Sequence, residues 1–123
     1  MVEEIAMPVR FVIALLASLL VRHGAEASEE NSGSHWLRKC TNPEPALQIE
    51  CAIYVRALVE YDEVRGTTLG QMRYICPARD LTIGQSREVV IRSLRDKPED
   101  LHRPFALLAH LALSAAFPCR QPR

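Results

Sequence analysis

The chain has 123 residues, the size of one domain with one hydrophobic core. Its 15 Lys and Arg residues balance 15 Asp and Glu residues, so the formal net charge at pH 7 is zero. A balanced charge excludes the strong positive field that is typical of proteins that bind nucleic acid or anionic membranes.

The N-terminal segment has the features of a secretory signal peptide. An apolar run at residues 11–21 is flanked by arginines and would span about 16 Å as a helix, roughly half of a bilayer core. Ala25 and Ala27 place small residues where a signal peptidase cleaves. We therefore expect residues 1–27 to be a signal peptide cleaved after Ala27 and the mature protein to be exported. The alternatives are a buried N-terminal helix and an uncleaved membrane anchor.

The cysteine content indicates that the exported domain is held together by disulfides. A domain of about 100 residues buries only about 60–70% of its unfolded surface, so covalent links add stability that a small core does not supply. Residues 28–34 are polar and contain glycine, which predicts a disordered leader. We therefore place the folded domain at residues 35–123.

Two helices are expected in the first half of this domain. Residues 35–40 can form a short helix, and two prolines within residues 41–45 then break the backbone. A long helix follows at residues 45–62, where an apolar stripe recurs at alternating spacings of four and three and comprises Leu47, Cys51, Tyr54, Leu58 and Tyr61. Residues 64–74 contain two glycines and two threonines, and they predict a loop.

Two further helices are expected in the second half. Thr82 and Gln85 form the capping-box pattern at the start of a helix over residues 83–96. A short turn leads to a last helix over residues 104–117, which is apolar on nearly all sides and is predicted to be central and covered on most sides. The expected fold class is all-α, a small disulfide-stapled bundle of about four helices.

Four cysteines can pair in three ways, and helix geometry favours one of them. The last two helices have equal predicted lengths, and the short turn between them makes them antiparallel. Cys76, before the first of them, then lies beside Cys119, after the second. Cys40 can meet Cys51 because the proline-broken turn folds back onto the long helix. A metal site is the weaker alternative, since no CxxC motif is present and no histidine lies at ligand spacing from a cysteine.

Short motifs around the cysteines carry a family resemblance. In chain order they are the signal peptide, Cys40, "CAIYV" at 51–55, "CP" at 76–77, "LTIGQSREVVIRSL" at 81–94, "PEDLHRPFALLAHLAL" at 98–113 and "AFPC" at 116–119. Together they resemble the Rap/Tai family of type VI secretion amidase immunity proteins. The resemblance covers residues 36–119, with the last motif the most specific.

The resemblance implies a periplasmic protein that binds and inhibits a peptidoglycan amidase effector and does no chemistry. No cofactor is expected, a homodimer is a possible state, and neither nucleic acid nor, after signal cleavage, a membrane is an expected partner. Two other functions remain open: a periplasmic acid-stress chaperone of the Hde type and an orphan helical protein-binding module. The chaperone would need carboxylates that hold a core or an interface, whereas the carboxylates here are spread along exposed faces.

The loop at residues 64–74 is the best candidate for a contact surface. Its hydrogen-bond donors and its adaptable methionine suit a polar enzyme cleft, and the candidate partner-binding residues are Arg65, Thr67, Thr68, Gln71, Met72 and Arg73. An ordinary solvated connection is the alternative interpretation. A second candidate surface is better explained as a solvated helix face and comprises Arg87, Glu88, Arg92 and Arg95.

Catalytic residues are not expected. Ser114 and His110 lie one turn apart on the apolar last helix, where the histidine is better explained as a core residue and the serine as a hydroxyl bonded to its own helix. Turn chemistry and the charge preference of helix N-termini explain the remaining carboxylate cluster, which comprises Asp96, Glu99 and Asp100. An enzyme is therefore disfavoured.

Overall fold

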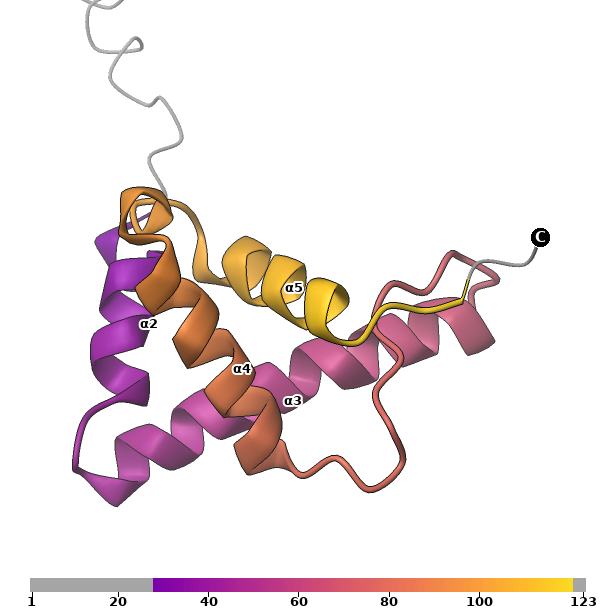
Figure 1. Cartoon of the computed structure of the whole chain (residues 1–123), viewed down its shortest axis with the longest axis horizontal. Coiled ribbons are helices and arrows are strands. Elements are labelled where there is room, and N and C mark those ends of the chain that lie inside the picture. The colour runs from indigo at the N-terminus through magenta and orange to yellow at the C-terminus, as the bar shows by residue number, and fades with distance from the viewer. Residues whose placement is uncertain (1–27, 121–123) are drawn as a thin grey trace, which may run out of the picture.

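The computed structural model describes residues 28–120, and within this range it is all-α (Figure 1). Its elements are the 3-10 helix η1 (Glu29–Asn31), α2 (Gly33–Cys40), α3 (Pro45–Thr67), α4 (Ile83–Asp96), the 3-10 helix η2 (Pro98–Asp100) and α5 (Phe105–Ala116). The predicted small helical bundle with two disulfides is confirmed. The expected signal peptide, residues 1–27, lies outside the described residues.

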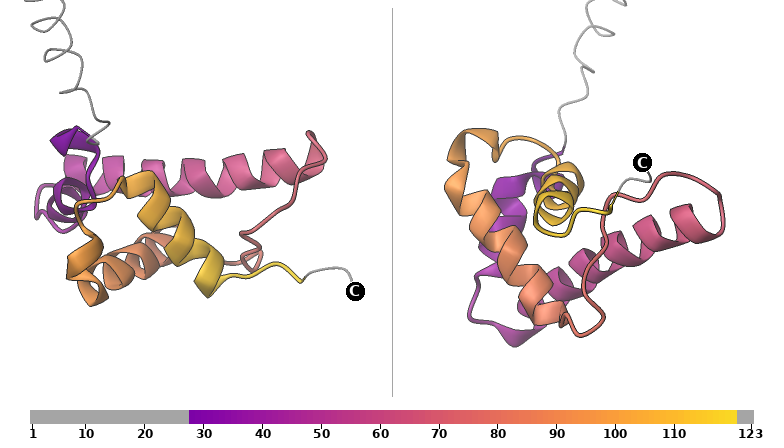
Figure 2. Two further views of the ribbon diagram at one scale, coloured as in Figure 1. Left: turned by 90° about the horizontal axis from the view of Figure 1, so that it is seen from above. Right: turned by 45° about the vertical axis from the view of Figure 1, so that its right-hand side comes forward.

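The long helix α3 is the axis of the molecule. Its 23 residues span about 35 Å. Helices α4 and α5 pack against one side of α3, and α2 lies at its N-terminal end (Figure 2). The C-terminal turns of α3 extend beyond the other helices, and the chain returns beside them before α4 begins (Figures 1 and 2).

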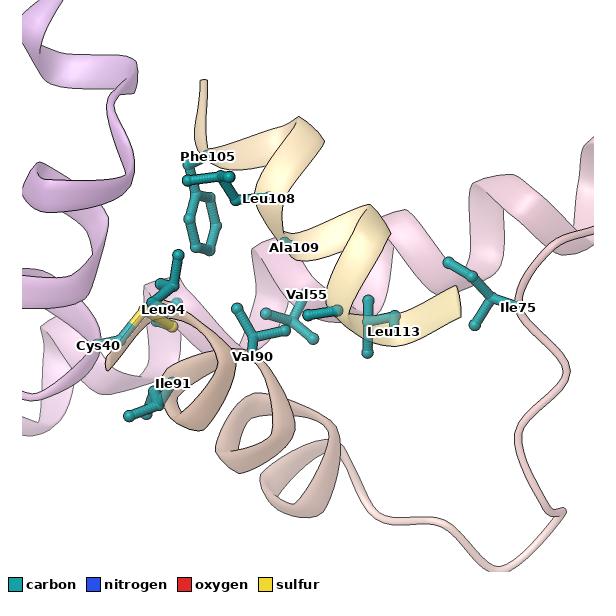
Figure 3. Packing of buried hydrophobic residues seen from close by; sticks show 12 residues of the cluster. Cys40, Val55, Ile75, Val90, Ile91, Leu94, Phe105, Leu108, Ala109 and Leu113 are labelled. Atoms are coloured by element: carbon teal, nitrogen blue, oxygen red, sulfur yellow. A yellow bond between two sulfur atoms is a disulfide. The ribbon is translucent and has the colours of Figure 1, made fainter. Parts of the chain in front are cut away.

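The hydrophobic core lies where the four α-helices meet (Figure 3). The ring of Trp36 in α2 stacks on Phe105 of α5, with centroids 5.0 Å apart, and Tyr54 of α3 meets Phe105 edge-on at 5.1 Å. The buried apolar residues are Cys40, Cys51, Val55, Ile75, Val90, Ile91, Leu94, Phe105, Leu108, Ala109, Ala112 and Leu113. Val55 is the last fully buried apolar residue of α3. Leu58 and Val59 still pack against the core, whereas Tyr61 and Val64 beyond them are exposed.

Two disulfides cross-link the helical domain, in the pairs that helix geometry favoured. Cys40–Cys51 links α2 to α3 with a Cα–Cα distance of 5.2 Å, and both cysteines are buried. Cys76–Cys119 links the segment before α4 to the segment after α5, with a Cα–Cα distance of 4.9 Å. Beside it, the Cys76 N–H donates to the Phe117 carbonyl at 2.8 Å. The second disulfide therefore ties the returning chain to the C-terminal segment.

Residues 28–34 are ordered, which corrects the expectation of a disordered leader. They form η1 and the first turn of α2, and the buried Ser32 caps that helix. The Gly33 N–H donates to the Arg103 carbonyl at 2.9 Å, and a Cβ on Gly33 would lie only 2.5 Å from Leu108 Cδ1. A glycine that allows this close approach lets a polar segment dock on the bundle. The polar composition of residues 28–34 alone had predicted a disordered segment.

Helix α3 is longer than expected, because it continues to Thr67 instead of ending at Asp62. The apolar stripe predicted along it holds at Cys51, which is buried, but not at Tyr61, which is 61% exposed. Asp62, which lies outside the predicted apolar stripe, is only 1% exposed. Tyr61 is exposed because the last turns of α3 lie beyond α4 and α5. Asp62 is buried because the returning chain covers the side of α3 that bears it.

Helix α5 is covered on one side only, which corrects the expectation of a helix enclosed on most sides. Phe105, Leu108 and Leu113 are buried, whereas Leu107 and Leu111 are exposed. The predicted end residues, Pro104 and Phe117, are the caps of α5 rather than members of it. Because α5 forms the outer surface of the bundle, one of its apolar faces remains in contact with solvent.

Replacing Thr82 by Ala should destabilise α4 by about 1 kcal/mol, because it removes a helix cap. The capping box is present: the Gln85 N–H donates to Thr82 Oγ1 at 3.2 Å, and the Thr82 N–H donates to Gln85 Oε1 at 2.8 Å. Urea unfolding would measure the loss, with Thr82→Ser as the control that keeps the hydroxyl. Equal stability of the Ala variant and the wild type would contradict the role of the cap.

Candidate partner-binding site

A buried carboxylate on α3 holds the end of the returning chain. Asp62 Oδ2 accepts the N–H groups of Tyr74 at 3.0 Å and Ile75 at 2.9 Å, and Oδ1 also approaches the Tyr74 N–H at 3.2 Å. The side chain of Ile75 is fully buried, and its backbone pairs with Pro118 in an isolated bridge. The return loop, which we define as residues 68–75, is therefore attached firmly at its far end.

The near end of the return loop folds back onto the last turn of α3. The Gln71 N–H donates to the Arg65 carbonyl at 3.0 Å, and Arg65 Nε donates to Gln71 Oε1 at 2.8 Å. Between them, Gly70 has a φ of 62°, in the left-handed region that favours glycine. These contacts give the loop one defined conformation at the end of α3.

Arg73 strengthens the loop from inside. Its alkyl chain lies against Gly66, where a Cβ would overlap with Arg73 Cγ. Its Nη2 donates to the Ile75 carbonyl at 3.2 Å. Arg73 is half-buried and is largely engaged with its own chain.

Aromatic rings flank Arg65 on the outer side of the loop. The guanidinium carbon of Arg65 lies 5.9 Å from the ring centroids of both Tyr61 and Tyr74. The Tyr74 ring meets His110 of α5 edge-on at 5.7 Å. Tyr and Arg are enriched among the residues that dominate protein–protein binding energies. We define the loop face as Tyr61, Arg65, Leu69, Gln71, Met72 and Tyr74, which together combine such anchors with exposed apolar side chains.

Hollows lie on both flanks of the return loop. One, of about 480 Å³, is lined by Gly70, Gln71, Met72, Arg73, Cys76, Cys119 and Arg120. A larger one, of about 630 Å³, lies on the other side of Arg73, and its lining includes Arg56, Glu60, Glu63, Arg79 and Ser86. A loop with open space on both sides can enter a concave surface of another protein.

The structure brings only some of the predicted contact residues together. Arg65 and Gln71 bond to each other, and Met72 is exposed beside them. Thr67 is directed at its own helix, because its hydroxyl donates to the Glu63 carbonyl at 2.8 Å. Thr68 is the exposed C-cap of α3.

Three members of the loop face were missed by sequence reasoning: Tyr61, Leu69 and Tyr74. Leu69 lies in the loop predicted as a contact surface but was not among its six candidate residues. Tyr61 had been assigned to the buried stripe, because a continuous helical period gives no sign of where a bundle stops covering a helix. Tyr74 stands at the end of a polar segment and has no periodic pattern of its own. Asp62 was missed for a related reason, since an acidic residue on a helix is usually solvated.

The other candidate residues make local contacts. The Ser114 hydroxyl donates to the Leu111 carbonyl at 3.1 Å, as expected for a serine bonded to its own helix. Arg87 on α4 bonds to Gln48 at 3.3 Å and to Glu88 at 3.2 Å.

In the described part of the chain, no group of three or more His, Cys, Asp or Glu side chains is placed to hold a metal ion. Within residues 28–120, no helix is both long and apolar enough to cross a membrane.

Comparison with known proteins identifies a family. The family model of Rap1a immunity proteins matches residues 32–119, a segment that contains the four cysteines, all of the α-helices of the described range and the loop face. No curated protein and no solved structure gives a significant match. The matched segment is well over half of the chain and agrees with the resemblance seen in the sequence motifs. The chain therefore belongs to the Rap1a immunity proteins.

Proposed function

We propose that this protein is a periplasmic immunity protein that binds and neutralises a peptidoglycan amidase delivered by the type VI secretion system. Membership of the Rap1a family supports an immunity role against type VI effectors, and such proteins generally act without catalysis. The amidase as target follows from the resemblance of the cysteine-flanking motifs. The observation that carries the proposal is the loop face, a contact surface already ordered by the protein's own hydrogen bonds.

The loop face inhibits by occupying the amidase cleft. Arg65 and Gln71 present hydrogen-bonding groups, while Leu69 and Met72 present apolar surface. Because the loop is held in place before binding, little conformational entropy is lost when the complex forms. Tight occlusion of the cleft then excludes peptidoglycan without any chemical step.

The proposed compartment agrees with the covalent structure. Disulfides persist in oxidising compartments such as the periplasm and are rare in the cytosol. Both pairs, Cys40–Cys51 and Cys76–Cys119, lie within the matched domain. Peptidoglycan lies in the same compartment, so an exported inhibitor would meet the amidase where it acts.

Partner capture tests the proposed function. The full chain, tagged after Arg123, would be produced in its own source and used to isolate proteins from periplasmic and secreted fractions. We expect one peptidoglycan amidase to be retained at a stoichiometry of one to one or two to two and to lose its activity when bound. A heterogeneous set of proteins retained only at low pH would support the chaperone instead. Retention of a single protein without peptidoglycan-cleaving activity would contradict the amidase as target.

We also propose that the protein forms a homodimer through α3. Ile49, Ile53 and Ala57 recur at every fourth position and are all exposed, which gives an apolar row across the outer surface of the helix. A two-fold interface uses the same patch on both subunits, and a row of this kind can pack antiparallel against its own copy. The small side chain of Ala57 at one end of the row lets two helices approach closely.

Replacing Ile53 by Glu should convert this dimer to a monomer, because two carboxylates would then be buried near the two-fold axis. Size-exclusion chromatography with light scattering measures the mass directly. Leu111→Glu is the matched control, since it makes the same change at an exposed leucine on α5. A wild-type protein that is monomeric at about 100 μM, well above a typical micromolar Kd, would contradict the dimer. So would an Ile53→Glu variant that remains dimeric.

A further inference from the structure

The buried carboxylate of Asp62 is not part of the loop face, but it bonds to the return loop. It is only 1% exposed and accepts hydrogen bonds from two successive backbone N–H groups of the return loop. A buried charge is strongly unfavourable unless donors satisfy it, and here the donors come from the far end of the loop. This interaction selects one loop position, because the carboxylate is satisfied only when residues 74 and 75 lie against α3.

A chain of contacts connects Asp62 to the loop face. The carboxylate holds the Tyr74 backbone, and the Tyr74 ring lies against the Arg65 guanidinium. Arg65 in turn bonds to Gln71 near the tip of the loop. The position of the Tyr74 backbone thereby sets the spacing between both ends of the loop face, although Asp62 itself is inaccessible to a partner.

We infer that Asp62 is a positioning residue for partner recognition, which holds the loop face in its binding conformation before the partner arrives. This inference rests on the proposed function. When only a fraction of molecules has the binding conformation, the apparent Kd rises by the inverse of that fraction. Loss of the Asp62 contacts therefore lowers the association rate constant, while the dissociation rate constant of the completed complex changes little.

The test compares Asp62→Asn with the wild-type chain in two measurements. Hydrogen exchange at the Tyr74 and Ile75 amides reports whether the loop is still held. Binding kinetics on a catalytically inactive type VI peptidoglycan amidase from the same source report recognition. We expect both amides to exchange at least about tenfold faster and association to slow by about tenfold, with dissociation changed by less than about threefold. Asp62→Ser removes the same charge with less volume, should Asp62→Asn fold poorly.

Val90→Ala is the control for a general loss of stability. Val90 is fully buried in the core on α4, away from the return loop, and truncating it destabilises the fold without touching the Asp62 contacts. We expect this variant to keep the wild-type association rate constant at a temperature where both variants are folded. An equal slowing in Val90→Ala would overturn the inference, because the effect would then be structural.

The remaining outcomes separate this inference from the proposed function. If the wild-type chain binds the amidase and Asp62→Asn associates at the wild-type rate, the positioning role is overturned and the immunity function stands. This conclusion holds both when the Tyr74 and Ile75 amides exchange faster than in the wild type and when their exchange is unchanged. If the wild-type chain binds no amidase, the proposed function is overturned and the positioning role with it.

Discussion

Replacing Cys119 by Ser should lower the stability of the oxidised protein by about 4 kcal/mol, the loop-entropy value for a link between positions 43 apart. This is a large part of the roughly 5–15 kcal/mol that stabilises a typical domain. Cys76–Cys119 holds the returning chain to the segment after α5, where the Cys76 N–H also bonds to Phe117. Without the link, that end of the molecule depends on Ile75 and on the Asp62 contacts.

Thermal unfolding followed by circular dichroism measures this loss. For a domain of this size we expect the Tm in oxidising buffer to fall by roughly 15–30 °C. The double variant Cys76→Ser with Cys119→Ser controls for the thiol left behind by the single change. In excess reductant, wild type and variant should unfold together, because neither then has a disulfide. If the single variant melts with the wild type in oxidising buffer, the disulfide does not stabilise the domain as argued.

Removing the hydrogen-bonding side chains of the loop by Arg65→Ala, Gln71→Ala and Arg73→Ala should weaken binding of the amidase by more than about 100-fold. Truncation of one interface arginine at a hot spot, here Arg65, costs about 2 kcal/mol or more, and the loss of Gln71 and of the support from Arg73 adds to it. Arg65 and Gln71 act on the loop face itself. Arg73 acts by supporting the loop against Gly66 and Ile75. Isothermal titration calorimetry with the inactive amidase measures the change.

Two further variants make the loop result specific. The pair Arg65→Ala and Gln71→Ala leaves the support from Arg73 in place, so most of the loss should remain if the exposed groups contact the amidase. The pair Arg92→Ala and Arg95→Ala removes the same number of arginines as the triple variant from an exposed face of α4 and should bind like the wild type. Unchanged affinity of the triple variant would show that the loop is not the contact surface.

Local rules predicted those features of this protein that depend on neighbouring residues or on one pair of helices. The capping box at Thr82 formed as expected, because both partners lie within one turn. The pairing of Cys76 with Cys119 followed from two helices of similar length joined by a short turn. The motifs around the cysteines also carried the family, which the match over residues 32–119 confirms.

Sequence patterns were less informative wherever the outcome depended on what covers a helix. The stripe on α3 has the same period throughout, yet Cys51 is buried and Tyr61 is exposed, because α4 and α5 cover only part of α3. The period of α5 likewise did not predict that Leu111 faces solvent.

The sequence by itself determined that these helices form, which cysteines pair and which family the protein belongs to, since each depends on local spacing or on short motifs. Tertiary structure decided which side chains form the loop face. Asp62 is buried because residues 74 and 75 return to it from 12 and 13 positions away and supply backbone donors. No local pattern encodes that encounter, because the burial of a charge depends on which distant groups arrive to satisfy it.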